Sequence, residues 1–165
     1  MRRIFLVILT LLIICSVNLF DAKNFFGGEN FNLADAQEVE VTENFAEEVL
    51  YYVNVEREKV GLNPLKLSPN LMKAAEIRAE ELPEKFSHTR PNGKPCFTAI
   101  KIPYKYVGEN IAAGQRNPQA VVEAWMNSEG HRKNILSPKF GKLGVGYIYV
   151  PENEYRHFWV QLFKN

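Results

Sequence analysis

The sequence predicts an α+β fold in which helices are layered against antiparallel strands. Two helix-start signals, Ser68-Pro69 and Asn117-Pro118, each place a capping residue before a proline and precede apolar residues at helical spacing. Near the end of the chain, Gly141 to Val150 and Tyr155 to Phe163 are rich in β-branched and aromatic residues on either side of a turn, which indicates a hairpin. Helices mixed with antiparallel strands predict a single layered domain.

The N-terminus has the layout of a secretory signal. Two arginines follow Met1, and Ile4 to Phe20 is almost unbroken apolar sequence. Residues 1–22 are therefore expected to be a signal peptide. Because no small-x-small cleavage site precedes Ala22 and the apolar stretch approaches the length of a spanning helix, an N-terminal anchor is the alternative. Both readings predict an exported protein, secreted or extracellular, and in the second case tethered by an uncleaved helix.

Charge is distributed unevenly along the chain. Residues 21–50 carry eight acids and one lysine, whereas residues 51–165 carry 17 Lys or Arg and 11 acids. Residues 23–41 show no sustained period, so we expect an acidic linker there and the folded domain over 42–165. A basic exported domain favours an anionic wall polymer or a membrane surface as partner, with solubility as the alternative explanation. The sequence has no run of basic residues interleaved with aromatic residues, so we do not expect nucleic acid as a partner.

Three helices are expected before the hairpin. The first runs from a Thr42 cap to about Val60, with Gly61 as its stop. The second runs from Ser68 to Pro83, and the third begins at Asn117, is interrupted by Gly130 and continues as a short turn. The residues expected on their buried faces are Phe45, Val49, Tyr52, Val53, Val60, Leu71, Ala74, Ala75, Arg78, Leu82, Val121, Val122, Trp125 and Met126.

Cys96 is the only cysteine beyond the leader, so an internal disulfide in the domain is excluded. We expect Cys96 to be buried and inert and the domain to be stabilised by packing alone. Trp125 and Trp159 are expected to be core aromatic residues rather than carbohydrate platforms.

Three ionisable residues are candidates for chemistry. His88 lies in a loop after the second helix, His131 lies at the break in the third, and Glu109 opens a small-residue segment. A histidine can bind a metal or move a proton near neutral pH, although most histidines are structural hydrogen-bonding groups. If Glu109 is buried it must be paired, and two kinds of partner are open: an imidazole of His88 or His131, or an internal arginine, Arg57 or Arg78.

Spacing alone establishes neither a metal site nor a nucleophile. The intervals between His88, Glu109 and His131 contain no compact motif such as His-Glu-x-x-His. The candidate nucleophiles, Ser87, Ser128 and Cys96, do not lie in a recognisable nucleophile elbow.

A family resemblance connects these residues. From about Asn44 to Phe163 the chain resembles the CAP superfamily of cysteine-rich secretory proteins, antigen 5 and pathogenesis-related 1 proteins, in its bacterial single-domain branch. The resemblance implies a three-layer α-β-α sandwich with a central antiparallel sheet and an open cleft. The motifs that carry it, in order, are Val53-Asn-Val-Glu-Arg57, Gly61-Leu-Asn-Pro-Leu65, Phe86-Ser-His88, Gly108-Glu-Asn-Ile111, Ala124-Trp-Met-Asn-Ser128, Gly130-His-Arg-Lys-Asn-Ile-Leu136, Gly144-Val-Gly-Tyr147 and Phe158-Trp-Val-Gln161.

In eukaryotic members of that superfamily the cleft holds two histidines and two glutamates, and in some a divalent metal such as zinc. His88 and Glu109 match the first histidine and the first glutamate. Ser128 stands where the second glutamate is expected, with Glu129 one position later, and His157 falls one residue before the position of the second histidine. Because adjacent strand residues face opposite sides, His157 is expected to point away from the cleft.

In the bacterial branch, Gly130-His131-Arg132 is a hallmark, so the resemblance implies that His131 supplies the second imidazole. The predicted catalytic set is then His88, Glu109 and His131, with zinc or a similar divalent cation as the candidate cofactor on His88 and His131. The predicted ligand-binding residues are Asn110, Ser128, Glu129 and Gln161.

The function expected from the resemblance is that of an exported binding or interaction module with a His/Glu cleft for a small apolar, lipid or wall-derived ligand. The alternative is a metal-assisted or His/Glu-dependent hydrolase, peptidase-like, acting on the cell envelope. A third reading is an envelope factor whose surfaces matter more than its cleft. Whether the protein is an enzyme stays open at this level, because one fold hosts unrelated functions.

Overall fold

The computed structural model describes residues 33–165, with side chains from residue 44 onward. The predicted signal peptide or anchor and residues 23–32 of the predicted linker lie outside the described residues. In chain order the elements are α2 (Leu33–Glu58), β1 (Lys66–Leu67), α3 (Pro69–Glu81), the 3-10 helix η1 (Cys96–Ala99), β2 (Val107–Ala113), α4 (Pro118–Asn127), α5 (Glu129–Ile135), β3 (Lys142–Tyr149) and β4 (His157–Lys164).

The strands form one four-stranded sheet in the order β1-β3-β4-β2. The predicted hairpin is confirmed, because β3 and β4 pair antiparallel, and β2 pairs antiparallel with β4 on its other side. The two-residue β1 is the exception to the expected antiparallel sheet, because it pairs parallel with β3. A parallel neighbour requires a crossover connection, and here the chain between β1 and β3 passes through α3, η1, β2, α4 and α5.

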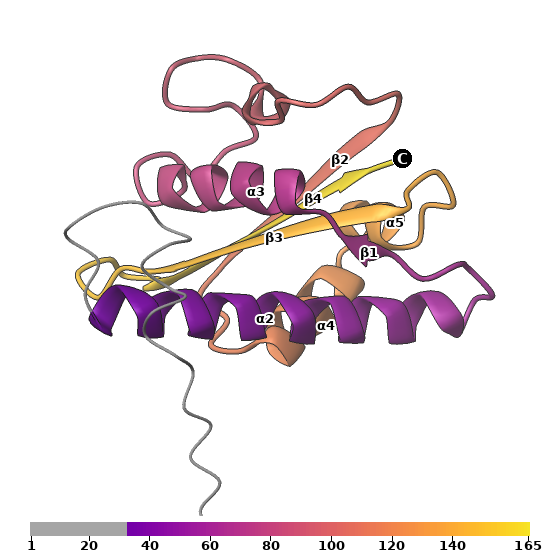
Figure 1. Cartoon of the computed structure of the whole chain (residues 1–165), viewed down its shortest axis with the longest axis horizontal. Helices are drawn as coiled ribbons and strands as arrows, with labels where there is room; N and C mark the ends of the chain where they lie inside the picture. The colour runs from indigo at the N-terminus through magenta and orange to yellow at the C-terminus, as the bar shows by residue number, and fades with distance from the viewer. Residues whose placement is uncertain (1–32) are drawn as a thin grey trace, which may run out of the picture. The chain divides into compact units, whose positions relative to one another are not determined.

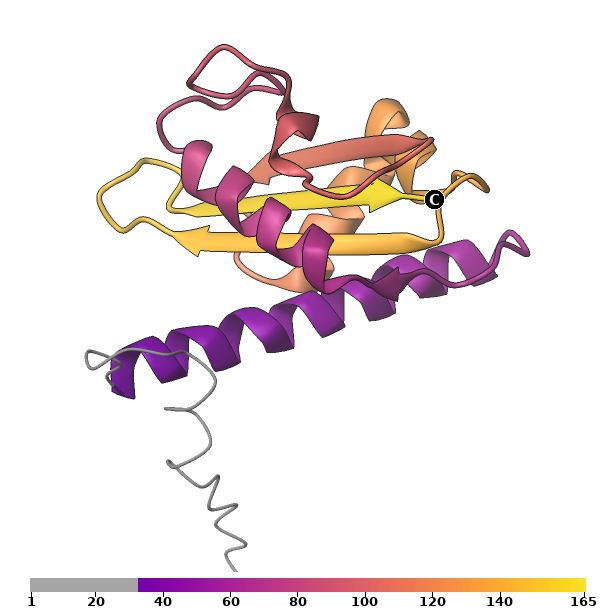
Figure 2. The ribbon, with the colours of Figure 1, turned by 45° about the horizontal axis from the view of Figure 1, so that its top comes forward.

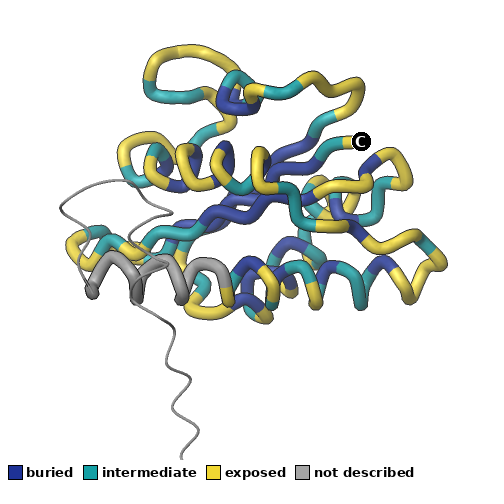
Figure 3. Tube along the Cα trace, in the orientation of Figure 1, coloured by how far each residue is buried: buried dark blue, intermediate teal, exposed yellow. Residues whose placement is uncertain are grey.

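Helices cover both faces of the sheet, which confirms the predicted three-layer α-β-α sandwich (Figures 1 and 2). The side chains of β4 show the two faces by alternation: Phe158, Val160 and Leu162 pack in the core with α3, whereas Trp159 and Phe163 pack in the core with α2 and α4. β2 and β4 are accordingly buried along most of their length, and β3 is buried over four residues near its start (Figure 3).

Two glycines of β3 set the distance between the sheet and α3. A Cβ atom at Gly144 would lie 2.3 Å from the backbone of Leu71, and one at Gly146 would lie 2.1 Å from the carbonyl oxygen of Ala75. No side chain fits at these distances, so the backbones of helix and strand are in direct contact. This close approach fixes α3, and therefore Arg78 on its buried face, against the sheet.

Two boundaries differ from the prediction. The first helix begins at Leu33, not Thr42, because residues 33–41 are mostly good helix formers without a breaker, so that part of the predicted linker is helical. It ends at Glu58, and Val60 is exposed. The break after α4 falls at Ser128, whose extended backbone ends one helix and starts the next, while Gly130 lies inside α5.

The predicted helix caps and three predicted core residues are confirmed, whereas Phe45, Tyr52 and Met126 are only partly buried. Ser68 and Asn117 are the N-caps of α3 and α4, and the Asn117 side chain accepts a hydrogen bond from the backbone N–H of Ala120. Cys96, Trp125 and Trp159 are buried. Over the residues that the structure describes, no helix has both the length and the apolar character needed to cross a bilayer.

Candidate functional site

The site is built on β2, which is an edge strand of the sheet. Alternation along the strand sends the Glu109 side chain toward the face covered by α3 and the Asn110 side chain toward the face covered by α4 and α5. The sequence reading did not predict this strand, because Val107 and Ile111 are its only β-branched residues, it has no aromatic residue, and its other positions are small or polar.

Glu109 is buried and has partners of both predicted kinds. Its carboxylate accepts a hydrogen bond from Arg78 Nε at 2.9 Å, and its other oxygen lies 2.6 Å from His88 Nδ1. Burial alone would raise the pKa of Glu109, but the hydrogen bonds from His88 and Arg78 and the charges of both outweigh it, so the pKa is lowered. Glu109 is therefore an anion that joins a helix arginine to a loop histidine.

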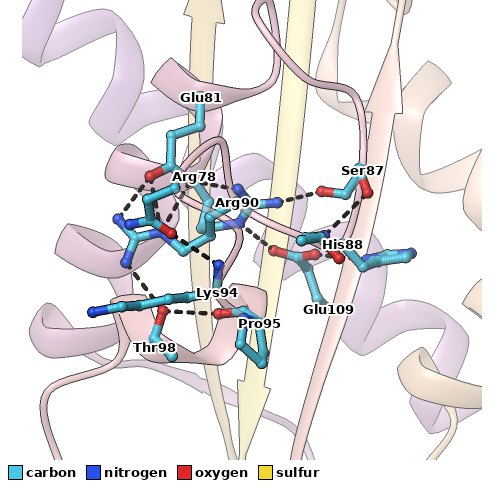
Figure 4. Close-up of polar contacts among 11 residues, drawn as sticks. Arg78, Glu81, Ser87, His88, Arg90, Lys94, Pro95, Thr98 and Glu109 are labelled. Atoms are coloured by element: carbon cyan, nitrogen blue, oxygen red, sulfur yellow. Dashed lines mark hydrogen bonds and ion pairs between the residues drawn. The ribbon is translucent and has the colours of Figure 1, made fainter.

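The loop that carries His88 is fastened to α3 by a second set of ion pairs (Figure 4). Arg78 also pairs with Glu81, and it donates a hydrogen bond to the backbone carbonyl of Ser87 at 2.6 Å. Arg90, which follows His88 in the loop, donates hydrogen bonds to Glu81 Oε1 from Nη2 at 2.6 Å and from Nε at 2.8 Å. The backbone on both sides of His88 is thus anchored to one helix.

His88 itself is presented outward. Its side chain is 58% exposed, whereas the Glu109 side chain it contacts is 1% exposed. Because Glu109 is an acceptor only, neutral His88 must carry its proton on Nδ1, which leaves the lone pair of Nε2 free. This carboxylate-held imidazole is an arrangement that serves both metal ligands and general bases.

A separate amide network holds the other face of β2. Asn110 Nδ2 donates to Gln161 Oε1 at 3.0 Å and to the backbone carbonyl of His131 at 3.2 Å. Asn134 Nδ2 donates to Asn110 Oδ1 at 2.8 Å and to the carbonyl of Glu109 at 3.2 Å. Gln161 is fully buried, and its Nε2 has no hydrogen-bond partner among the described residues. The predicted ligand-binding residues Asn110 and Gln161 thus clamp α5 to the sheet.

His131 lies in the first turn of α5, and its backbone carbonyl accepts the hydrogen bond from Asn110. Burial lowers the pKa of His131, and the charge of His88 lowers it further, so the two rings lie within electrostatic reach of each other. His131 is therefore a neutral imidazole at neutral pH. That it completes a site with His88 stays a prediction.

The other predicted site residues lie in different surroundings. Glu129 pairs with Lys133 at 2.6 Å on an exposed turn of α5, and Ser128 is the residue between the two helices. His157, at the opposite end of the β2–β4 ladder from Glu109, contacts the Tyr147 hydroxyl at 2.9 Å.

Cys96 lies close to the His88–Glu109 pair, although the sequence did not indicate it as a metal ligand. Ligand atoms of His88, Cys96 and Glu109 all lie within 4.8 Å of one another. Burial, and then the neighbouring charge of Glu109, raises the pKa of Cys96 to about 12, so its sulfur keeps a proton. Both Glu109 oxygens are also engaged by other side chains. A metal at this trio would have to displace the contacts of Glu109 with Arg78 and His88, whereas Nε2 of His88 is open to a ligand without that cost.

Sequence reasoning named Arg78 as one alternative partner but missed Glu81, Arg90 and Asn134. Glu81 and Arg90 flank the loop, and only the fold shows that they face each other across it. Asn134 lies three residues after His131, where helical spacing places it on the same side of α5. That spacing was the available signal.

The three-layer fold is that of CAP domains, also called SCP domains. The chain belongs to the CAP family, the cysteine-rich secretory protein family, whose profile matches residues 50–163.

Relatives come from several bacteria. The chain is 44% identical over 124 residues to the uncharacterized protein YkwD of Bacillus subtilis, a match that covers 72% of this chain and 46% of that protein. Among solved structures it resembles an extracellular protein containing an SCP domain from Bacillus anthracis, with 26% identity, a TM-score of 0.67 and coverage of 84% and 45% of the two chains. It also resembles an outer surface protein of Borrelia burgdorferi, with 26% identity, a TM-score of 0.64 and coverage of 72% and 90%. The chain therefore spans less than half the length of the curated relative.

Proposed function

We propose that this protein is an exported CAP-domain binding module that works at the cell surface or outside the cell, and that His88 Nε2 is the atom that meets its ligand. The bacterial neighbours described as extracellular or outer surface proteins support the location, and the signal-like N-terminus agrees with it. The ligand class that we expect is a small apolar, lipid or wall-derived molecule with one polar group for the imidazole.

The observation that carries the proposal is the contrast in exposure across one hydrogen bond. Glu109 is buried and fixed by Arg78, while the ring that it holds is more than half exposed. A histidine kept for packing would be buried with its carboxylate. Fixing the ring before binding lowers the entropy cost of ordering it in a complex.

Binding is favoured over covalent catalysis by the surroundings of the ring. In the part of the chain that the structure describes, the polar side-chain contact of His88 is with Glu109, not with a hydroxyl or thiol. The nearby thiol, Cys96, is protonated and buried. A nucleophile adjacent to a base is the arrangement that covalent catalysis requires.

A hydrolase that activates water is the second candidate. The Glu109–His88 pair favours it, because a carboxylate-oriented imidazole can take a proton from a water molecule held at Nε2. With His131 nearby, the same nitrogen could instead hold a divalent cation such as zinc, which would supply Lewis-acid polarisation of a bound oxygen. His88 and His131 would be the protein ligands in that case.

Calorimetric titration of the full-length chain with zinc tests the metal arm. His88→Ala and His131→Ala are compared with His157→Ala, which removes an imidazole at the far end of β4 and serves as the matched control. Binding that the first two variants lose and the control keeps would establish a two-histidine site. Retention of binding by His88→Ala would contradict the role of this nitrogen.

The ligand arm uses extracted envelope lipids and wall fragments, with bound material identified by mass spectrometry. If the protein is a binding module, it should retain one of these molecules in stoichiometric amount and release no products. His88→Ala should retain less of it. Turnover of any of these fractions that is lost in His88→Ala would replace the binding function with the hydrolase.

A further inference from the structure

One end of the sheet carries a row of lysines. Lys66 of β1 is the register partner of Lys142 at the start of β3, and Lys142 is the register partner of Lys164 at the end of β4. Directly opposite residues on neighbouring strands project from the same face of a sheet. Their neighbours Leu67 and Leu143 pack in the core with α2, so the three lysines project on the α3 side, beyond the N-terminus of that helix.

The row continues onto the loop before β2. Lys164 Nζ donates a hydrogen bond to the carbonyl of Pro103 at 2.9 Å, which brings this lysine to the loop. There, the ammonium groups of Lys105 and Lys139 lie 5.4 and 4.9 Å from the centre of the Tyr106 ring. We call the group formed by Lys66, Lys105, Lys139, Lys142 and Lys164 the lysine row.

The lysine row lacks ion pairs in the described part of the chain. None of its five members forms an ion pair there, whereas exposed lysines elsewhere do: Lys59 pairs with Glu56, and Lys133 pairs with Glu129. Like charges placed directly opposite on neighbouring strands destabilise a sheet. A bound polyanion would offset this repulsion and release its own counterions.

We propose that the lysine row binds a linear polymer of phosphodiesters. Neighbouring strands lie about 4.8 Å apart, so the three strand lysines form a regularly spaced line of charge rather than a single pocket. Lysine binds phosphate as a point charge, without demanding a fixed geometry.

A polymer fits this surface better than a lipid bilayer. Interfacial binding to a bilayer combines lysines with apolar side chains that insert into it. The large exposed side chains of the adjoining loop are Tyr104 and Tyr106, and the Tyr106 ring already has two ammonium groups over it. The proposal does not depend on His88.

The test is titration of the full-length chain with synthetic poly(glycerol phosphate), at low and at near-physiological salt. Lys66→Gln/Lys142→Gln removes two charges from the row, and Lys85→Gln/Lys94→Gln removes two exposed charges elsewhere as the matched control. We expect the row variant to bind roughly tenfold more weakly and the control to bind nearly as the natural protein does. Added salt should weaken binding by the natural protein more steeply than binding by the row variant.

Two parallel titrations separate the sources of phosphate. Inorganic phosphate should bind far more weakly than the polymer, and vesicles of phosphatidylglycerol with phosphatidylcholine should not compete with it. Equal losses in the row and control variants, or a preference for the vesicles, would overturn the proposal. His88→Ala should bind the polymer unchanged, so failure of the cleft function and failure of this one are distinguishable.

Discussion

Arg57 and Arg78 are both almost completely buried, one on each side of the sheet, but they have different partners. Arg57 donates hydrogen bonds to the backbone carbonyls of Asn63, Ile135, Ser137 and Phe140 and forms no ion pair with any described residue. Arg78 bonds to the carboxylates of Glu109 and Glu81, and through Glu109 it reaches an exposed imidazole.

The two arginines have different roles on the two sides of the domain. Backbone carbonyl groups do not titrate. The hydrogen bonds from Arg57 therefore hold the end of α5 and the following loop against α2 at any pH at which the domain is folded. Carboxylates titrate, and one carboxylate can hydrogen-bond to two side chains at once. Arg78 therefore helps to fix Glu109, which in turn orients His88. One arginine supports the fold, and the other supports the site.

The largest effect on stability is expected from Arg57→Met. It leaves several buried carbonyls without a donor, which should lower the free energy of unfolding by about 4 kcal/mol. Urea unfolding measures the loss. The fraction that stays folded should keep the native His88 environment, and a changed His88 signal in that fraction would contradict the division between the two arginines.

Arg78→Met is expected to cost about 3 kcal/mol, because it leaves Glu109 buried without its permanent cation. Unlike the Arg57 loss, this loss should shrink as the pH falls, since protonation neutralises the orphaned carboxylate. Unfolding curves of both variants at neutral and acidic pH test the contrast. If the two variants lost stability with the same pH dependence, the proposed difference between the two arginines would be wrong.

Gly146→Ala should destabilise the domain by about 2 kcal/mol, because the added Cβ collides with the backbone of α3 at Ala75. Displacement of α3 should also move Arg78, so the change reaches the site although it lies on β3. A matched substitution, Gly141→Ala, has open space around the new Cβ and should cost much less. Similar losses for the two variants would contradict the close packing of α3.

Glu109→Gln should have a smaller effect on stability, and that effect should depend on pH. Its pKa is lowered in the folded protein, so the stability that its charge contributes is present above its unfolded pKa of about 4.3 and is lost as the pH falls through the folded value. Glu109→Gln should therefore be less stable than the natural protein at neutral pH, with the gap closing in acid. A gap that stays constant with pH would assign the loss to packing instead of charge.

Much of the fold could be predicted from local chemistry. The caps at Ser68 and Asn117 and the hairpin of β3 and β4 depend on neighbouring residues, which sequence displays directly. β1 and β2 could not be predicted in this way, because a two-residue parallel strand and a strand of small residues are defined by their partners.

The site divides in the same manner. His88 and Glu109 were identified, and the two alternatives for the partner of Glu109 are both realised, since its carboxylate has one oxygen for each. The fastening of the loop through Glu81 and Arg90 depends on a contact across the fold that no spacing displays.

Buried Glu109 should orient His88 with Nε2 outward. Imidazole ¹⁵N chemical shifts, assigned with His88→Ala, report directly which nitrogen of the neutral ring carries the proton. We expect the Nδ1–H form of His88 in the natural protein and a shift toward the Nε2–H form in Glu109→Gln. A neutral His88 already in the Nε2–H form in the natural protein would contradict it.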